Sequence, residues 1–353
     1  MAALMSDGVP ADAAAPTSRP VLLVAVPVAR RAEFFDAGDA GRLADAAARL
    51  GGELVFAESL ADAAAEVDLA AVRVLVVSWG VPALDAARLD TLPRLELVAH
   101  CGASIRPFAT PELFRRGVLV TQAGAAMARS VAEVSLAFTL ALLHRIPRFD
   151  HALHAGSEWA DAEAAPPQHE LLDAPIGVVG ASRTGRAYLE LLVALGARPL
   201  LADPTVDAAE ARRLGAALVP LDVLLANSRI VALHAPSLPE THRMIGAREL
   251  ALMPTGAGLV NTARSWLVDE DALLAELGSG RIDAALDVFD DEPLPVDSPF
   301  RALPNALLVP HKAAGTREGR LRQGALVVSE VARHAAGRPL EHVVTEQDLE
   351  RMA

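Results

Sequence analysis

Short, continuous apolar runs alternate with alanine-rich stretches along most of the chain. Runs without polar alternation are typical of strands whose two faces are both covered by helices. In the first part of the chain these runs are Val21–Val26, Glu53–Phe56, Val72–Ser78, Leu95–His100 and Val118–Thr121. Ala32–Leu50 predicts a helix between the first two runs, ending at Gly51-Gly52. This strand–helix–strand order predicts an α/β domain with a parallel sheet.

A second set of apolar runs, again with helical stretches between them, predicts a second doubly wound sheet. These runs are Ile176–Val179, Pro199–Ala202, Ile230–Leu233, Gly258–Asn261, Ala284–Val288 and Ala306–Val309. Between the two sets, Ser130–His144 predicts a buried helix, with Ser130 and Glu133 as its capping box. The polar segment Arg145–Pro167 that follows indicates a domain boundary, and Glu318–His334 predicts a last helix.

Composition and charge narrow the range of partners. The chain has 353 residues and a formal net charge of −13, which argues against a nucleic-acid or membrane partner. Cys101 is the only cysteine, so an intrachain disulfide and a cysteine-based metal cluster are excluded, and we predict no metal site. The sequence shows no signal-peptide pattern and no uncharged apolar stretch of about 18 residues, so we expect a cytoplasmic protein.

A glycine-bearing turn, Gly177–Gly185, follows a predicted strand and opens a helical stretch. Strand, turn and helix in this order are typical of a dinucleotide site, in which the helix N-terminus faces the pyrophosphate. Gly180 would make the turn and Gly185 would let helix and strand pack closely. The candidate contacts of this turn are Gly180, Ser182, Arg183, Thr184 and Gly185. Since a serine stands at the middle glycine position, an ordinary strand-to-helix turn remains an alternative.

Asp203 ends the next predicted strand. An acid at this place can accept hydrogen bonds from the ribose hydroxyls of a dinucleotide and repels a 2′-phosphate, which favours NAD over NADP. The alternative is that Asp203 caps a turn with Pro204.

Three further strand ends carry polar side chains, and the carboxyl ends of parallel strands meet at one crevice. Arg264 can hold a substrate carboxylate through two hydrogen bonds. His311 can act as general acid or base, and Glu292 can favour its imidazolium and fix its ring. Taken singly, Arg264 could be a surface arginine, Glu292 part of a solvated acidic turn, and His311 a strand cap. Their order after a nucleotide turn favours the catalytic interpretation.

Together these segments resemble the D-isomer-specific 2-hydroxyacid dehydrogenases, in particular the phosphoglycerate, hydroxypyruvate and glyoxylate reductase-like members. The matching segments are Gly177–Gly185, Leu233–Pro236, Glu240–His242, Gly258–Arg264, Val268–Leu273, Gly280–Val288, Glu292-Pro293, Leu303–Asn305 and Pro310-His311, with weaker matches at Gly117–Gln122 and Val131–Glu133.

The resemblance implies two Rossmann-like domains, a flavodoxin-like substrate domain and an NAD-binding domain. We therefore predict a tail at 1–19, a substrate domain formed by 20–146 and 318–345, an NAD-binding domain at 147–317, and a second tail at 346–353. It also implies a homodimer formed largely through the NAD-binding domain.

The family's site residues are carried over position by position. The resemblance implies a catalytic set of Arg264, Glu292 and His311. It implies NAD contacts at the glycine turn and at Asp203, His234, Pro236, Thr241, Thr262 and Asp287. Substrate contacts are expected from Arg264 and from two loops of the first domain, at Trp79, Gly80, Gly102, Ala103 and Ser104. Trp79 is either a hydrophobic wall of the site or ordinary core packing.

Some positions depart from the family pattern. Ser182 and Ser265 replace glycines, and Met127 and Ser130 differ from the usual Asn and Pro. Glu292 stands where related formate dehydrogenases have Gln, which argues against that activity. Lys312, the only lysine, follows His311 and would add positive charge if it faced the cleft.

The function we predict is an NAD(H)-dependent oxidoreductase that interconverts a small 2-oxo acid and its D-2-hydroxy acid. A non-catalytic NAD-sensing protein on the same fold is the first alternative, because fold does not dictate function. A nucleotide-fold methyltransferase is the second, which the imperfect glycine turn alone would permit.

Overall fold

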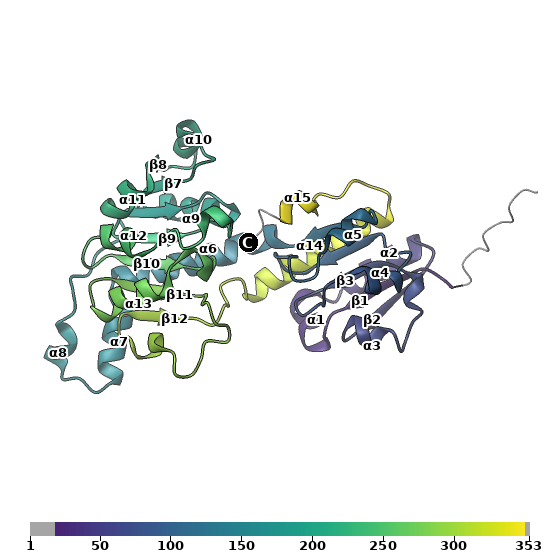
Figure 1. The fold of residues 1–353 in the computed structure, drawn as a ribbon, viewed down its shortest axis with the longest axis horizontal. Helices are drawn as coiled ribbons and strands as arrows, with labels where there is room; N and C mark the ends of the chain where they lie inside the picture. The colour runs from purple at the N-terminus through teal and green to yellow at the C-terminus, as the bar shows by residue number, and fades with distance from the viewer. Residues whose placement is uncertain (1–17, 350–353) are drawn as a thin grey trace, which may run out of the picture.

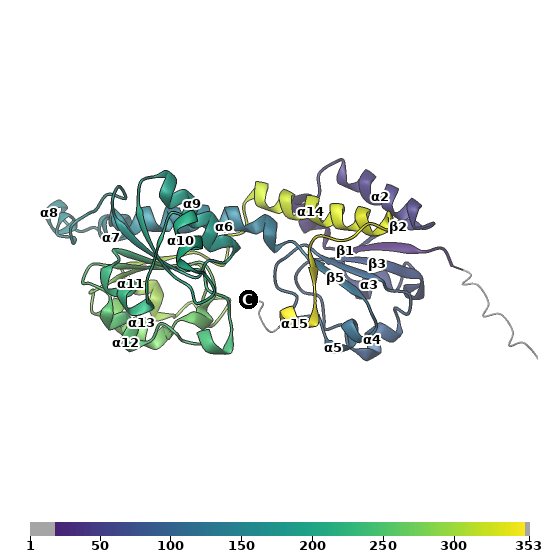
Figure 2. The same ribbon diagram turned by 90° about the horizontal axis from the view of Figure 1, so that it is seen from above.

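The computed structural model describes residues 18–349, so the tail predicted at 1–19 lies almost wholly outside the described residues. Two lobes lie side by side, each a mostly parallel sheet with helices on both faces (Figures 1 and 2). The predicted fold class, two parallel-sheet α/β domains, is confirmed. Continuous apolar runs predicted the strands correctly because both faces of each sheet are covered.

The first lobe contains a six-stranded sheet in the order β13-β5-β4-β3-β1-β2. Its strands are β1 (Val21–Ala25), β2 (Glu53–Ala57), β3 (Val72–Val77), β4 (Leu97–His100), β5 (Leu119–Gln122) and β13 (Val343–Val344). Its helices are α1 (Val28–Phe34), α2 (Asp39–Arg49), α3 (Leu60–Ala63), α4 (Ala86–Asp90), α5 (Pro111–Arg115), α14 (Arg317–Ala335) and α15 (Glu346–Leu349). Without β13, which pairs antiparallel to β5, the order is that of flavodoxin-like sheets.

The single helix predicted over Ala32–Leu50 is wrong in one respect, since two helices, α1 and α2, occupy this region. Phe35 leaves the helix in an extended conformation. The Asp36 carboxylate then accepts hydrogen bonds from the backbone N–H groups of Gly38 and Asp39, at 2.8 and 3.0 Å. A short acidic side chain that satisfies the following N–H groups competes with the helix and starts a new one.

The second lobe contains a seven-stranded sheet in the order β12-β11-β10-β9-β6-β7-β8. Its strands are β6 (Pro175–Val179), β7 (Arg198–Ala202), β8 (Ala217–Leu218), β9 (Ile230–Leu233), β10 (Gly258–Asn261), β11 (Asp283–Leu286) and β12 (Ala306–Leu308). Its helices are α7 (Ile146–His154), α8 (Trp159–Glu163), α9 (Arg183–Ala194), α10 (Ala208–Arg213), α11 (Leu221–Asn227), α12 (Ala247–Leu252) and α13 (Glu270–Gly278). Strand order reverses between β6 and β9, which is where open α/β sheets bind ligands.

The long helix α6 (Gly124–Leu143) lies at the junction of the lobes and begins six residues before Ser130. The predicted capping box is therefore wrong: Ser130 is buried inside the helix, and its hydroxyl lies 2.8 Å from that of Thr316. The Gln122 side chain accepts a hydrogen bond from the Gly124 N–H at the true start. Among the described residues, α6 is the one helix long and apolar enough to cross a bilayer, but here it packs against protein.

The C-terminal helix α14 and strand β13 pack against the N-terminal part of the chain in the first lobe. Helix α14 lies against α1 and α2, and β13 extends the first sheet, so the C-terminal segment returns as the resemblance implies. Helix α6 packs chiefly on α9 and the second sheet, through Phe138 and Leu142. The boundary at residue 146 stays a prediction, but α6, which it assigns to the first domain, shares the hydrophobic core of the second.

Candidate active site

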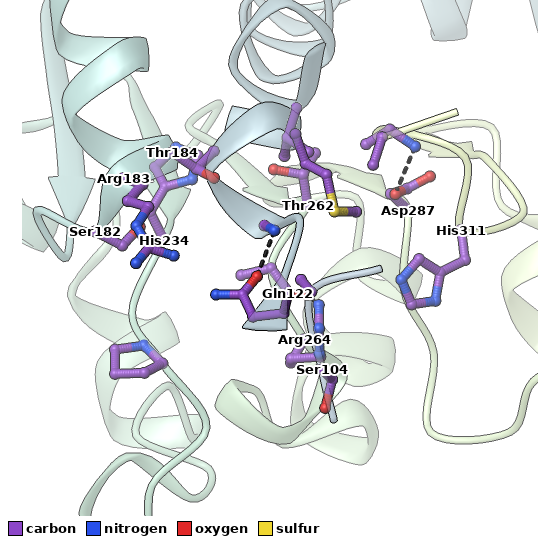
Figure 3. Close-up of a pocket in the computed structure, with 18 of the residues that line it drawn as sticks. Ser104, Gln122, Ser182, Arg183, Thr184, His234, Thr262, Arg264, Asp287 and His311 are labelled. Carbon is purple, nitrogen blue, oxygen red and sulfur yellow. Dashed lines mark hydrogen bonds between the residues drawn. The ribbon is translucent and has the colours of Figure 1, made fainter. Parts of the chain in front are cut away.

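A cavity of about 960 Å³ lies between the lobes and is lined by residues of both. Twelve of the predicted site residues line it: Trp79, Ala103, Ser104, Ser182, Arg183, Thr184, His234, Pro236, Thr262, Arg264, Asp287 and His311. Figure 3 shows the α9 residues on one side and His311 on the other, with Arg264 and Ser104 between them. Seven predicted residues do not line it: Gly80, Gly102, Gly180, Gly185, Asp203, Thr241 and Glu292.

The proposed acid–base pair forms as predicted. His311 Nδ1 lies 2.7 Å from Glu292 Oε2, although the residues are 19 apart in sequence. Glu292 Oε1 accepts a hydrogen bond from the Phe289 N–H at 3.1 Å, which holds the carboxylate in place. Because Nδ1 faces the carboxylate, Nε2 is the nitrogen left for a substrate. Glu292 therefore contacts the His311 ring without itself lining the cavity.

His311 has a φ of 51°, in the left-handed region that few residues other than glycine adopt. The buried Asp287 carboxylate holds this turn, since it accepts the N–H groups of Lys312 at 2.7 Å and Ala313 at 3.0 Å. Burial raises the pKa of Asp287, and these two N–H donors oppose the shift. Asp287 thus fixes the backbone that carries His311, and its predicted contact with NAD stays a prediction.

Arg264 follows β10 and is oriented by its own loop. Asn261 bridges the loop: its side-chain amide donates to the Arg264 carbonyl at 2.9 Å and its oxygen accepts the Ala263 N–H at 3.1 Å. Arg264 Nη1 donates to the Ala263 carbonyl at 2.6 Å. Burial lowers the pKa of Arg264, while Glu292 and Asp287 oppose the shift. A partly buried guanidinium of this kind is suited to pairing with a substrate carboxylate.

The glycine turn has the tight geometry that the motif predicts. Gly180 has a φ of 96°, and a Cβ there would lie 2.6 Å from the Ala235 nitrogen. A Cβ on Gly185 would lie 2.1 Å from the Gly180 carbonyl oxygen. Ser182 caps α9, since its hydroxyl accepts the Gly185 N–H at 3.2 Å. Both glycines are therefore required by close approach, and the serine is accommodated as a helix cap.

Asp203 lies at the end of β7 but does not line the cavity. Its Oδ2 accepts the Ala181 N–H at 2.7 Å, and its Oδ1 accepts the Thr205 N–H and hydroxyl at 2.8 and 2.6 Å. Burial raises the pKa of Asp203, but these donors and Arg186 outweigh it and lower the pKa overall. The carboxylate thus braces the glycine turn as well as forming a turn with Thr205, which is close to the alternative weighed from the sequence.

Three other residues assigned by resemblance have clear structural partners. Thr241 donates from its hydroxyl to the Pro236 carbonyl at 2.7 Å, and so shapes the loop after β9 without lining the cavity. The Thr262 hydroxyl lies 2.7 Å from that of Ser135 on α6. A Cβ on Gly102 would lie 2.5 Å from His100 Nε2, so a glycine is required where this loop folds back against the His100 side chain.

His234 lies at the cavity wall, is only 3% exposed, and neither ring nitrogen has a hydrogen-bond partner within the structure. Burial lowers the pKa of His234 to about 3, so the imidazole is neutral. Unpartnered buried polar atoms are costly unless a ligand or water satisfies them. Together with the glycine cradle, this histidine fits a dinucleotide at the opening of α9.

The low pKa of His234 predicts a pH-dependent stability. Below the ordinary histidine pKa of about 6.5, the unfolded chain takes up a proton that folded His234 does not. Stability should therefore fall with pH below about 6.5, and His234→Gln should lessen the fall by about 1.4 kcal/mol per pH unit. Urea unfolding of wild type and His234→Gln at pH 7 and pH 5 measures this change in the free energy of unfolding. His154→Gln, at an 81% exposed side chain, is the control, and an equal slope in wild type and His234→Gln would contradict the prediction.

Comparison with known proteins agrees with this geometry. The model of the D-isomer specific 2-hydroxyacid dehydrogenase NAD-binding domain matches residues 136–313. A glyoxylate reductase of Aeropyrum pernix is 33% identical over 269 residues, which cover 75% of this chain and 80% of that protein. The chain belongs to the D-isomer-specific 2-hydroxyacid dehydrogenase family.

Other family members cover the chain to different extents. The D-3-phosphoglycerate dehydrogenase of Mycobacterium tuberculosis is 36% identical over 255 residues, covering 72% of this chain and 48% of that protein. The chain thus spans about half the length of the curated D-3-phosphoglycerate dehydrogenases it matches. The crystallised 2-hydroxyacid dehydrogenase of Ketogulonicigenium vulgare is 26% identical, with a TM-score of 0.75 over 93% of this chain and 99% of that one.

Membership of the family confirms the resemblance and assigns NAD to the second lobe, whose sequence matches the family's NAD-binding domain. The sequence did not anticipate several other residues that line the cavity, among them Arg30, Glu33, Gln122 and Arg320. Arg30 and Glu33 lie on α1 and Arg320 lies on α14. The chain has 31 arginines, and nothing in the sequence distinguishes Arg30 and Arg320 from the others. Lys312 does line the cavity, which the sequence left open.

Proposed function

We propose that this protein is an NAD-dependent oxidoreductase that interconverts a small 2-oxo acid and its D-2-hydroxy acid. The observation that carries the proposal is the His311–Glu292 pair at 2.7 Å, beside Arg264, in the cavity that the glycine turn also borders. Related proteins named glyoxylate reductase and D-3-phosphoglycerate dehydrogenase support the same reaction class. NAD, when bound, supplies or accepts the hydride.

Arg264, His311 and Glu292 have separate roles in substrate binding and proton transfer. Arg264 binds the carboxylate of the 2-oxo acid through parallel N–H donors and so orients the neighbouring carbonyl. His311 Nε2 gives a proton to the carbonyl oxygen during reduction and removes it again in the reverse direction. Glu292 holds the ring through Nδ1 and balances the charge of the imidazolium. Closure of the two lobes around the cavity would exclude water from the transfer.

The test is NADH oxidation with a panel of 2-oxo acids. Turnover of at least one with NADH is expected. NADH binding without turnover of any would favour the NAD-sensing alternative. Binding of S-adenosylmethionine in place of NADH would favour the methyltransferase.

Cofactor choice gives a separate prediction. We propose that Asp203 disfavours a 2′-phosphate, because its ionised carboxylate stands beside the glycine turn, where it accepts the Ala181 N–H. Asp203→Ala should weaken NADH binding while NADPH gains relative to it. Fluorescence titration with both cofactors measures the ratio. Asp207→Ala, in the same loop, is the control, and an unchanged ratio in Asp203→Ala would remove this role.

We also propose a homodimer formed through the NAD-binding domain and a cytoplasmic location. Support for the dimer comes from apolar side chains on α7 and α8, which project from this lobe (Figure 1). Ile146, Leu153 and Trp159 are 54%, 49% and 70% exposed, and exposed apolar side chains of this kind favour contact with a second copy.

Trp159→Ser combined with Leu153→Ser should convert the dimer to a monomer in sedimentation experiments. Val296→Ser, at an exposed apolar residue elsewhere on this lobe, is the control and should leave the dimer intact. A wild-type monomer at micromolar concentration would contradict the proposal.

A further inference from the structure

Two arginine guanidinium groups lie over the ring of Trp79, which follows the end of β3. The Arg320 Cζ atom lies 4.4 Å from the ring centroid, and the Arg30 Cζ atom lies 5.5 Å from it. The Trp79 ring also packs 5.7 Å from that of Phe34, between ring centroids. The loop after β3 and the helices α1 and α14 thus bring two like charges onto one indole. The ring quadrupole compensates only part of that charge.

The same three residues line the cavity that contains Arg264 and His311. Trp79, Arg30 and Arg320 belong to the wall of the first lobe, whereas Arg264 and His311 project from the second. The cavity therefore presents cations from opposite lobes. Arg264 is already assigned to the carboxylate beside the reacting carbonyl, which leaves the first-lobe pair for another part of the ligand.

Arg320 is held in place and its charge is only partly balanced. Its Nη1 donates to the Gln323 side-chain oxygen at 3.2 Å, and Gln323 is fully buried. Glu33 Oε2 lies 3.7 Å from Arg320 Nε, and the Glu33 side chain is 52% exposed, so water screens this pair. Burial lowers the pKa of Arg320. With Arg30 included, the cluster carries two positive charges against one negative.

A guanidinium that lies over an aromatic ring still recognises anions. Cation–π contact uses the flat face of the group, while its N–H donors lie in the plane and point outward at the edge. A carboxylate or a phosphate matches that edge with parallel hydrogen bonds. Contact with the Trp79 ring limits the freedom of both guanidinium groups, which reduces the entropy lost when an anion binds.

We propose that Arg30 and Arg320, positioned on Trp79, bind an anionic group at the end of the substrate remote from its 2-oxo carboxylate. The enzyme would then favour 2-oxo acids that carry a second carboxylate or a phosphate over neutral ones of equal length. This inference rests on the proposed function. It gives Trp79 a role that differs from the hydrophobic wall considered from the sequence, since an apolar wall would favour the neutral substrates.

Matched substrate pairs test the proposal directly. 2-Oxoglutarate and 2-oxopentanoate have the same chain length and differ in the terminal carboxylate, as do oxaloacetate and 2-oxobutanoate. 3-Phosphohydroxypyruvate and hydroxypyruvate differ in the phosphate. In at least one pair, kcat/KM with NADH should be tenfold or more higher for the dianionic member. The carboxylate pairs and the phosphate pair separate the two sources of the anion.

Variants of Arg30 and Arg320 then test whether these two residues cause the preference for dianionic substrates. Arg30→Gln and Arg320→Gln should each lower the dianion-to-neutral ratio of the preferred pair about tenfold, and Arg320→Lys should recover part of it. Arg317→Gln, on the same helix but outside the cavity lining, should leave the ratio unchanged. Arg30 makes fewer ring contacts than Arg320, so its variant keeps the test valid if Arg320→Gln fails to fold.

Each remaining outcome contradicts the proposal. Equal or better turnover of the neutral member in all three pairs would overturn it while leaving the reductase activity in place. A dianion preference that survives in Arg30→Gln and in folded Arg320→Gln would show that other residues bind the anion. Absence of turnover with every 2-oxo acid would overturn the proposed function itself, and this inference with it.

Discussion

His311→Gln should lower turnover of a 2-oxo acid by about 10²–10⁴-fold, the usual contribution of a positioned general acid. Glutamine keeps a side chain of similar polarity but cannot transfer a proton at neutral pH. The 2.7 Å contact with Glu292 leaves Nε2 as the only ring nitrogen available to the carbonyl oxygen. The residues of the glycine turn are untouched, so NADH binding should survive. Steady-state kinetics and fluorescence titration with NADH measure the two effects separately.

The control for this variant is His242→Gln. His242 is exposed, packs against Trp266 with ring centroids 4.1 Å apart, and does not line the cavity. Its loss should leave turnover near the wild-type value. Near-wild-type turnover of His311→Gln would remove His311 from the mechanism. Loss of NADH binding together with turnover would show that the variant disturbs the turn held by Asp287 rather than proton transfer alone.

The sequence predicted much of the fold because each strand is buried on both faces and therefore appears as an apolar run. The sequence did not predict features that depend on one side chain capping the nearby backbone, on a short strand at the edge of a sheet, or on a contact between distant residues. Asp36 divides one expected helix into two by capping its own backbone. β13, two residues long, forms only where the C-terminal segment meets β5. Ser130 looked like a helix cap, yet it contacts Thr316, 186 residues away. Pairings of that kind leave no local pattern.

In the candidate site, too, some features could be predicted from the sequence and others depend on tertiary contacts. Gly180 and Gly185 could be predicted because the turn itself demands them, and His311 and Glu292 because parallel strand ends converge. Asp203 follows the end of β7, as predicted, but its partners, Ala181 and Thr205, were not foreseen, and its contact with NAD stays a prediction. The Arg30–Trp79–Arg320 cluster needs α1 and α14 to pack together on the first lobe. Tertiary contacts between three distant segments create it, so composition alone could not single out these arginines.

Arg264→Gln should lower kcat/KM for a 2-oxo acid by about 10²-fold or more. Hydrogen bonds to a charged group contribute about 1.5–3 kcal/mol each, and the parallel pair that Arg264 offers a carboxylate would lose its charge and its second donor. The effect should fall mainly on KM, since carboxylate binding is present before the chemical step, with a smaller loss in kcat from poorer orientation.

Arg264→Lys distinguishes charge from geometry. Lysine keeps the positive charge but not the planar fork, so it should recover only part of the loss. Arg338→Gln, at an exposed residue outside the cavity lining, removes the same charge and should have little effect. Full activity in Arg264→Lys would show that charge alone binds the carboxylate. A kcat/KM within about threefold of wild type in Arg264→Gln would place the carboxylate elsewhere in the cavity, which Arg30, Arg183, Lys312 and Arg320 also line.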